Sequence, residues 1–344
     1  MKPSVRSRTH DTLRKKRKES VTLTIVAVLL ALLLVFAGVL LFVSPGTPKP
    51  FLDDSGRPLQ GSISEKITVN INGVGQGMFI KGKNAGKPVL LYRHGGMPDY
   101  FLTDHYPTGL DQDFIVVWWE QRGPWLSYSA NIAPESVTAE QLVADIVAVS
   151  NYLRARFGRE KIYLMGHSGG TLIGIRAAAR MPALFHAYIG VAQMSHQLES
   201  ERLAYEFMLQ RFKDSGDTRM VQQLEAAPVG ETAPLPDSYF KIRDVAMHQL
   251  GVGRTHDMTS IVTGLLLAFL LNREYTISEK VAMWRSKVFA DDHLWNTQLS
   301  TDRTTKVTRL DISVYVFHCV YVRGSGEDVK DRARGCTGGR EGSR

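Results

Sequence analysis

A serine between glycines is the part of this sequence best suited to chemistry. The run Gly166-His167-Ser168-Gly169-Gly170 has the pattern Gly-x-Ser-x-Gly. In this pattern the glycines leave room for a tight turn between a strand and a helix, and the turn holds the serine hydroxyl clear of the sheet. Such a serine attacks carbonyl carbon when a neighbouring base takes its proton. We therefore predict that Ser168 is a catalytic nucleophile.

The residues on either side of Ser168 predict the two elements that such a turn joins. Residues 161–165 form a short apolar run of strand length, and residues 171–180 form a run of small residues typical of a helix that ends near Pro182. A glycine-rich turn between a buried strand and a helix is also an ordinary structural feature. The motif by itself leaves that alternative open.

A second loop with glycines is the candidate oxyanion hole. The apolar residues 89–93 predict a buried strand, and His94-Gly95-Gly96 follows directly. In acyl transfer, backbone N–H groups that turn toward the substrate oxygen stabilise the oxyanion. We predict the N–H groups of Gly96 and Gly169 as these donors and expect His94 to brace its own loop. A plain Gly-Gly turn is the alternative.

Strand and helix patterns alternate along residues 62–194. We expect strands at residues 67–71, 77–81, 114–119 and 187–192, a helix from Thr138 with Gln141 in a capping box, and a later strand at 312–318. This alternation predicts an α/β fold with a mostly parallel sheet and helices on both faces. Arg122, which follows the strand at 114–119, is interpreted as a structural brace for nearby carbonyl groups.

Residues 195–300 break this alternation and are helical in pattern, which predicts an inserted helical cap. Residues 261–271 are apolar but too short to span a membrane, so we predict a buried cap helix there. Residues 301–322 would return to the core as an incomplete second part. Residues 323–344 contain six glycines and five arginines with no helical or strand period, and we expect a disordered tail.

A membrane anchor is predicted near the N-terminus. Residues 21–43 contain no charged residue, and as a helix they would cover roughly 35 Å, enough to span a bilayer. The basic run at 14–18 places the segment 1–20 in the cytoplasm and the rest of the chain outside the cell membrane. A cleaved signal peptide is the competing interpretation. Residues 44–61, rich in proline, would be a linker that holds the domain off the membrane lipid.

The net charge of +8 lies at the ends of the chain. Residues 1–20 carry eight basic and two acidic side chains, residues 323–344 carry six and four, and the body between them is neutral. A neutral body lacks the charge that phosphate recognition requires, so we expect no nucleic-acid partner. Two cysteines, Cys319 and Cys336, are too few for a disulfide framework or a cysteine-rich zinc site. We expect no metal and no other cofactor.

Three motifs together resemble a known family. His94-Gly95-Gly96, Trp119-Glu120-Gln121-Arg122-Gly123 and Gly166-His167-Ser168-Gly169-Gly170 stand in the order typical of α/β-hydrolases of the prolyl-iminopeptidase-like branch. The resemblance covers residues 62–321. It implies a serine nucleophile, an oxyanion hole and a cap that shapes substrate choice.

The resemblance also implies a substrate class. Peptidases of this branch remove N-terminal residues and place acidic cap residues near the amino group of the substrate. Glu199, Glu201 and Glu206 are eligible here, although a solvated helix face explains them equally well. The expected partners are small peptide, amide or ester substrates. A carboxylesterase-like hydrolase of small esters and a non-catalytic binding protein are the alternatives.

The C-terminal part departs from the family pattern. Cys319 and Val322 stand where the resemblance places a glycine and the triad acid, and the last histidine in the chain is His318. We identify neither a triad acid nor a triad base, and we expect His167 to point away from the turn. Because an unassisted serine is a poor nucleophile, we predict an inactive chain. Our hypothesis is a reading-frame shift near codons 319–322, and a natural variant terminus is the alternative.

Overall fold

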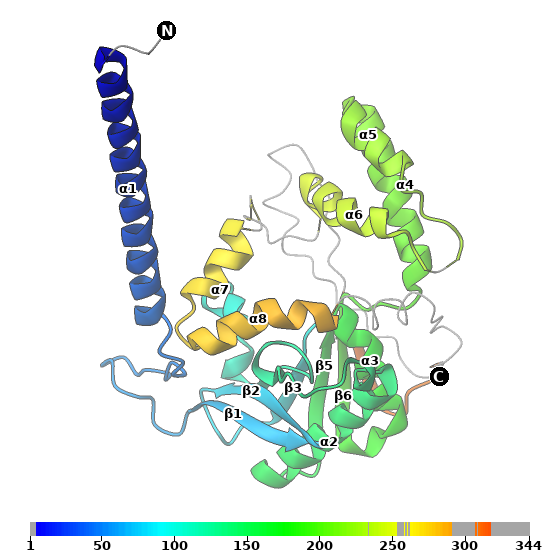
Figure 1. The fold of residues 1–344 in the computed structure, drawn as a ribbon. Coiled ribbons are helices and arrows are strands. Elements are labelled where there is room, and N and C mark those ends of the chain that lie inside the picture. The colour runs from blue at the N-terminus through cyan, green and yellow to red at the C-terminus, as the bar shows by residue number, and fades with distance from the viewer. Residues whose placement is uncertain are drawn as a thin grey trace.

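A twisted sheet with helices on both faces forms the body of the molecule (Figure 1). The computed structural model describes residues 5–232, 234–252, 258, 260, 262–290, 307 and 309–317. In this part of the chain the sheet has seven strands in the order β1-β2-β4-β3-β5-β6-β7. The strands are β1 (Ile63–Ile71), β2 (Val74–Gly82), β3 (Val89–Arg93), β4 (Ile115–Trp119), β5 (Ile162–His167), β6 (Phe185–Val191) and β7 (Ser313–Phe317).

The pairing of the strands confirms the predicted mostly parallel sheet. β1 and β2 form an antiparallel hairpin whose turn contains Asn72 at φ 49° and Gly73 at φ 81°. Two consecutive residues with positive φ suit a tight hairpin, which explains the Asn-Gly pair. β2 is antiparallel to β4, whereas β4, β3, β5, β6 and β7 run parallel to one another.

One face of the sheet is covered by α2 (Ala139–Phe157) and α3 (Gly169–Arg180). The side chain of Thr138 caps α2 by accepting from the N–H of Gln141, as predicted. The side chain of Gln141 does not complete the capping box and donates instead to Asp145 at 2.9 Å. Fully buried apolar residues of α2, among them Leu142, Ile146, Val149 and Leu153, belong to the core cluster on this face.

The predicted cap divides into two parts. α4 (Gln197–Ser215), α5 (Thr218–Glu225) and α6 (Asp237–Gln249) pack around a cluster of their own that includes Met208, Phe212 and Tyr239. A π-helical turn (Val262–Leu266), α7 (Leu267–Leu271) and α8 (Ile277–Ala290) do not belong to that cluster. Phe269 and Met283 from these elements pack instead with Phe79 and Trp125 on the second face of the sheet.

The prediction of a buried helix at residues 261–271 is confirmed for one side of the segment only, where Leu265, Leu266 and Ala268 pack with the core cluster of Phe269. Phe269 is 1% exposed, but Val262 is 60%, Leu267 45% and Leu271 47% exposed. The segment is apolar on every side, and the described protein covers only one of those sides. An apolar sequence predicts that a segment is removed from water, but it does not tell whether protein or another partner covers the segment.

The N-terminal helix α1 (Val5–Phe42) contains the predicted membrane span. Its apolar part, Ser20–Phe42, has 23 residues and is not buried against the rest of the protein. The segment that follows is not a free linker. Pro45 pairs with Thr276 as an antiparallel bridge, and the N–H of Gly46 donates to the carbonyl of Arg273 at 3.0 Å.

Candidate active site

Ser168 lies at the sharp turn between β5 and α3, as the sequence predicted. β5 ends at His167, α3 begins at Gly169, and Ser168 between them has φ 50° and ψ −125°. Positive φ costs a residue with a side chain on the order of 1–3 kcal/mol, so the surrounding structure must hold it there. Its N–H donates to the carbonyl of Val191 and its carbonyl accepts from the N–H of Thr171, both at 2.9 Å. Ser168 is half-buried.

The glycines of the motif allow close packing around this turn. A Cβ on Gly166 would lie 2.9 Å from Cα and 3.0 Å from the backbone nitrogen of Thr171. A Cβ on Gly170 would collide with the carbonyl oxygens of Arg93 and His94. The start of α3 therefore packs directly against the end of β3, which brings the loop after β3 to Ser168.

Gly95 is the residue of that loop that touches the serine. A Cβ on Gly95 would lie 3.0 Å from Cβ and 3.5 Å from Oγ of Ser168. Gly96 is exposed and would have nothing within 4 Å of an added Cβ. The N–H groups of Gly96 and Gly169 stay a prediction as oxyanion donors. Sequence reasoning did not single out Gly95 for this contact, and the Gly-Gly pair was the signal for it.

A buried arginine supports the loop from beneath. Arg93 is 2% exposed, and its guanidinium donates to the side-chain oxygen of Gln121 and to the carbonyl of His94. Burial lowers the pKa of Arg93 to about 9. His94 Nδ1 lies 2.9 Å from the carbonyl oxygen of Gly95, in agreement with the predicted bracing role. Burial, followed by the nearby Arg93 charge, lowers the pKa of His94 to about 3, so its imidazole is neutral.

The side chain of His167 meets a carboxylate from the same loop. Its Nδ1 lies 3.2 Å from Oδ2 of Asp99, and that oxygen accepts a hydrogen bond of 2.6 Å from the hydroxyl of Tyr92. Burial and the neighbouring carboxylate raise the pKa of Tyr92 well above its ordinary value, so the hydroxyl stays protonated and donates. Sequence reasoning missed Asp99, because nothing in its local pattern marks it.

Arg122 is a structural brace, as predicted, although its main partner is a carboxylate. Its guanidinium donates to Asp145 on α2 at 2.6 and 3.0 Å and approaches the carbonyl of Asn72 at 3.4 Å. Asp145 is fully buried and also accepts from the side chain of Gln76 at 2.9 Å. This network joins α2, the β1–β2 hairpin and the end of β4.

The three acidic residues predicted in the cap are each held by an arginine. Glu199 and Glu206 both pair with Arg202 on an exposed part of α4. Glu201 is 1% exposed and accepts from Arg243 at 2.6 and 2.7 Å. Glu199 and Glu206 therefore fit the solvated helix face, whereas Glu201 joins α4 to α6.

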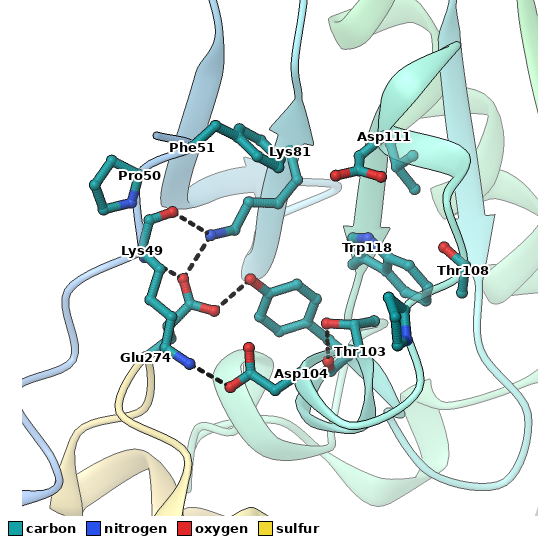
Figure 2. Close-up of a pocket in the computed structure, with 13 residues that line it drawn as sticks. Lys49, Pro50, Phe51, Lys81, Thr103, Asp104, Thr108, Asp111, Trp118 and Glu274 are labelled. Carbon is teal, nitrogen blue, oxygen red and sulfur yellow. Dashed lines mark hydrogen bonds and ion pairs between the residues drawn. The ribbon is translucent and has the colours of Figure 1, made fainter. Parts of the chain in front are cut away.

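A cavity of about 180 Å³, whose lining residues Figure 2 shows, does not have Ser168 in its walls. Its walls include Lys81 of β2, Val116 and Trp118 of β4, Tyr100 and Glu274. In the sheet, Val116 stands beside Leu90, which stands beside Tyr163, five residues before Ser168. None of the predicted site residues lines this cavity, so it is not the candidate active site.

The predicted absence of a triad acid and base falls outside the described residues, because the structure describes nothing from residue 318 onward. His318, Cys319 and Val322 therefore have no structural account. Within the described ranges, no three His, Cys, Asp or Glu side chains are grouped so that they could hold a metal ion.

The chain is similar to several known proteins. A family model for the alpha/beta hydrolase fold matches residues 70–232. The probable aminopeptidase YbaC of Bacillus subtilis (strain 168) is 27% identical over 269 residues, which are 78% of this chain and 82% of that protein. A proline iminopeptidase-related protein from Thermus thermophilus is 19% identical, covers 74% of this chain and 80% of its own, and has a TM-score of 0.44. An epoxide hydrolase from Vigna radiata is 17% identical over 79% of this chain and 85% of its own, with a TM-score of 0.38.

Proposed function

Because this chain belongs to the α/β-hydrolase superfamily, we propose that it is a membrane-anchored serine hydrolase that forms an acyl-enzyme on Ser168. The strained turn carries this proposal, since a half-buried serine at φ 50° between β5 and α3 stands against the glycine loop after β3. The strain is compatible with function because it holds the Cα–Cβ bond of Ser168 in one direction before substrate arrives.

The proposed reaction begins with attack of the Ser168 hydroxyl on a substrate carbonyl carbon. The negative charge that develops on the carbonyl oxygen would be stabilised by the N–H groups of Gly96 and Gly169. The leaving amine or alcohol departs with a proton, and water then releases the acyl group. Each proton transfer requires a base, and we identify no such base for Ser168 in this sequence. We therefore expect turnover far below that of an enzyme with a complete triad.

The proposed substrate is a small peptide or amide that loses its N-terminal residue. The support is the motif resemblance to prolyl iminopeptidases and the probable aminopeptidase among the relatives. A small ester is the alternative substrate, because the same fold and the same serine chemistry serve both bonds. Comparing aminoacyl-amide and short-chain ester substrates on the purified chain separates the two.

A fluorophosphonate probe tests the nucleophile. We expect slow labelling of the full chain in detergent micelles and no labelling of Ser168→Ala. Ser195→Ala is the matched control, because Ser195 lies outside the turn, in the segment between β6 and α4, and this variant should label like the parent chain. A folded parent chain that does not label would contradict the proposal and favour a non-catalytic binding protein.

We also propose that α1 anchors the chain in the cell membrane with its basic N-terminus in the cytoplasm and the hydrolase domain outside. Ser20–Phe42 is long and apolar enough to span a bilayer, and the basic residues that precede it favour this orientation. Protease added to intact cells should remove the domain and leave an N-terminal tag protected. Protection of the domain, or release of the chain by alkaline carbonate, would contradict the anchor.

A further inference from the structure

The end of the proposed membrane span is fixed to the domain by one lysine. Lys280 of α8 is buried, and its Nζ donates to Ser44 Oγ at 2.7 Å, to the carbonyl of Val43 at 3.2 Å and to the carbonyl of Leu270 at 2.7 Å. Carbonyls at helix C-termini lack partners within the helix, and a cation there satisfies them and favours the helix dipole. Lys280 therefore joins the C-terminal ends of α1 and α7.

The residues directly after the span are bonded to the domain and do not form a flexible linker. The Pro45–Thr276 bridge and the hydrogen bond from Gly46 to Arg273 follow within two residues of Ser44. Glu274 then accepts from the N–H of Lys49, as well as from Lys81 and Tyr100 (Figure 2). A bilayer spanned by α1 must therefore end next to α7 and the start of α8.

Exposed apolar side chains lie on both of these helices. They are Leu267 and Leu271 of α7 and Val281 and Trp284 of α8, with exposures of 45%, 47%, 43% and 48%, and we call them the α7–α8 patch. Leu271 and Val281 directly follow Leu270 and Lys280 in the sequence, and those two residues make the contacts at the end of α1. Figure 1 shows α1 leaving the domain on the side where α7 and α8 lie.

The residue types of this surface suit the boundary of a bilayer. Leucine and valine gain free energy when they leave water, and tryptophan is enriched at the level of the lipid headgroups. The guanidinium of Arg273 lies 5.3 Å from the ring centre of Phe42, the last residue of α1. Arginine at this depth can direct its charge to the headgroups while its stem stays apolar.

We propose that the α7–α8 patch is seated in the interfacial region of the same bilayer that α1 spans, so that the domain rests on the membrane and is not suspended from it. This inference rests on the proposed anchor. In this arrangement the first residues of the predicted linker, 44–61, attach the span rigidly to the domain. The ligand of the α7–α8 patch is membrane lipid.

Spin labels on the full chain in phosphatidylcholine vesicles test this inference. The label is attached to a single cysteine, either Leu267→Cys or Leu271→Cys, in a chain that also carries Cys319→Ser and Cys336→Ser. Its relaxation reports collisions with oxygen, which concentrates in lipid, and with a nickel complex, which stays in water. Leu30→Cys marks the centre of the span. Met181→Cys is the matched exposed control, because Met181 follows α3 on the other face of the sheet and is 38% exposed.

We expect the oxygen-to-nickel ratio at both α7 labels to be several-fold higher than at Met181→Cys and lower than at Leu30→Cys. Ratios at the α7 labels equal to that at Met181→Cys, with Leu30→Cys in lipid, would overturn the seating and leave the anchor intact. An aqueous ratio at Leu30→Cys would overturn the anchor and the seating together.

Discussion

His167 directly precedes the proposed nucleophile, Ser168, and its Nδ1 lies 3.2 Å from Oδ2 of Asp99. Asp99 follows the His94-Gly95-Gly96 loop, and His167 ends β5, so this pair joins the loop to the strand that carries Ser168. Tyr92 of β3 donates to the same carboxylate oxygen at 2.6 Å. The hydrogen bond from Tyr92 attaches the loop to β3, and Gly95 of the same loop lies against Ser168.

Tyr92→Phe should weaken this attachment. The change removes the donor to a carboxylate that is only 19% exposed, and an acceptor left without its partner costs about 1–3 kcal/mol of unfolding free energy. We expect a lower unfolding midpoint in denaturant and slower fluorophosphonate labelling of Ser168. Tyr163→Phe removes a hydroxyl from a half-buried ring on β5 and is the control. Equal losses in the two variants would show that the bond to Asp99 does not hold the loop.

Gly170→Ala should destabilise the fold by crowding the turn. The added Cβ would lie 2.9 Å from Cδ of Arg93 and would collide with two backbone carbonyl oxygens, which cannot move without displacing β3. Overpacking of this kind costs about 1–3 kcal/mol. The control is Gly230→Ala, where an added Cβ meets nothing within 4 Å. Thermal unfolding followed by tryptophan fluorescence compares the two, and an unchanged midpoint for Gly170→Ala would contradict this packing.

Asp145→Asn should cost far more stability than Glu140→Gln, although both residues lie on α2. Asp145 is buried and accepts from Arg122 at 2.6 and 3.0 Å, so removing its charge leaves a buried guanidinium without a counterion. Breaking such a pair costs about 3–5 kcal/mol. Glu140 pairs with Arg176 but is 68% exposed, and exposed pairs contribute about 1 kcal/mol or less. Denaturant unfolding measures both, and similar losses would refute the role of the buried network.

Glu120 should make stability depend on pH between about 4.5 and 8. Burial raises the pKa of Glu120 to about 8, against the opposing hydrogen bonds from the N–H of Leu126 and the hydroxyl of Tyr275. The folded chain then binds a proton that the unfolded chain has lost, so this contribution is complete below about 4.5 and is lost as pH rises through about 8. The loss amounts to a few kcal/mol.

Glu120→Gln is the test of that dependence. The amide resembles the protonated acid, since its oxygen can accept from the N–H of Leu126 and its nitrogen can donate to the hydroxyl oxygen of Tyr275. We expect the unfolding midpoint of this variant to fall less between pH 5 and pH 8 than that of the parent chain. Parallel curves for the two chains would mean that Glu120 does not titrate in this range.

Features that depend on a few neighbouring residues followed from the sequence. The Gly-x-Ser-x-Gly turn at Ser168 and the cap of α2 at Thr138 are set by steric limits and hydrogen bonds within four residues. The apolar span in α1 is equally local, because length and composition define it. These patterns were sufficient to predict an α/β fold and to select Ser168.

Contacts between distant residues were decided only by the tertiary structure. Gly95 and Gly96 are neighbouring residues of the same type. Only the folded structure places Gly95 against Ser168 and leaves Gly96 exposed. Lys280 donates to Ser44, which is 236 residues away in the sequence, and no local pattern predicts such a contact. The apolar sequence of α7 indicated burial, yet which of its sides meets protein depends on the elements that fold around it. Local rules act along the chain, whereas packing joins residues that the chain keeps far apart.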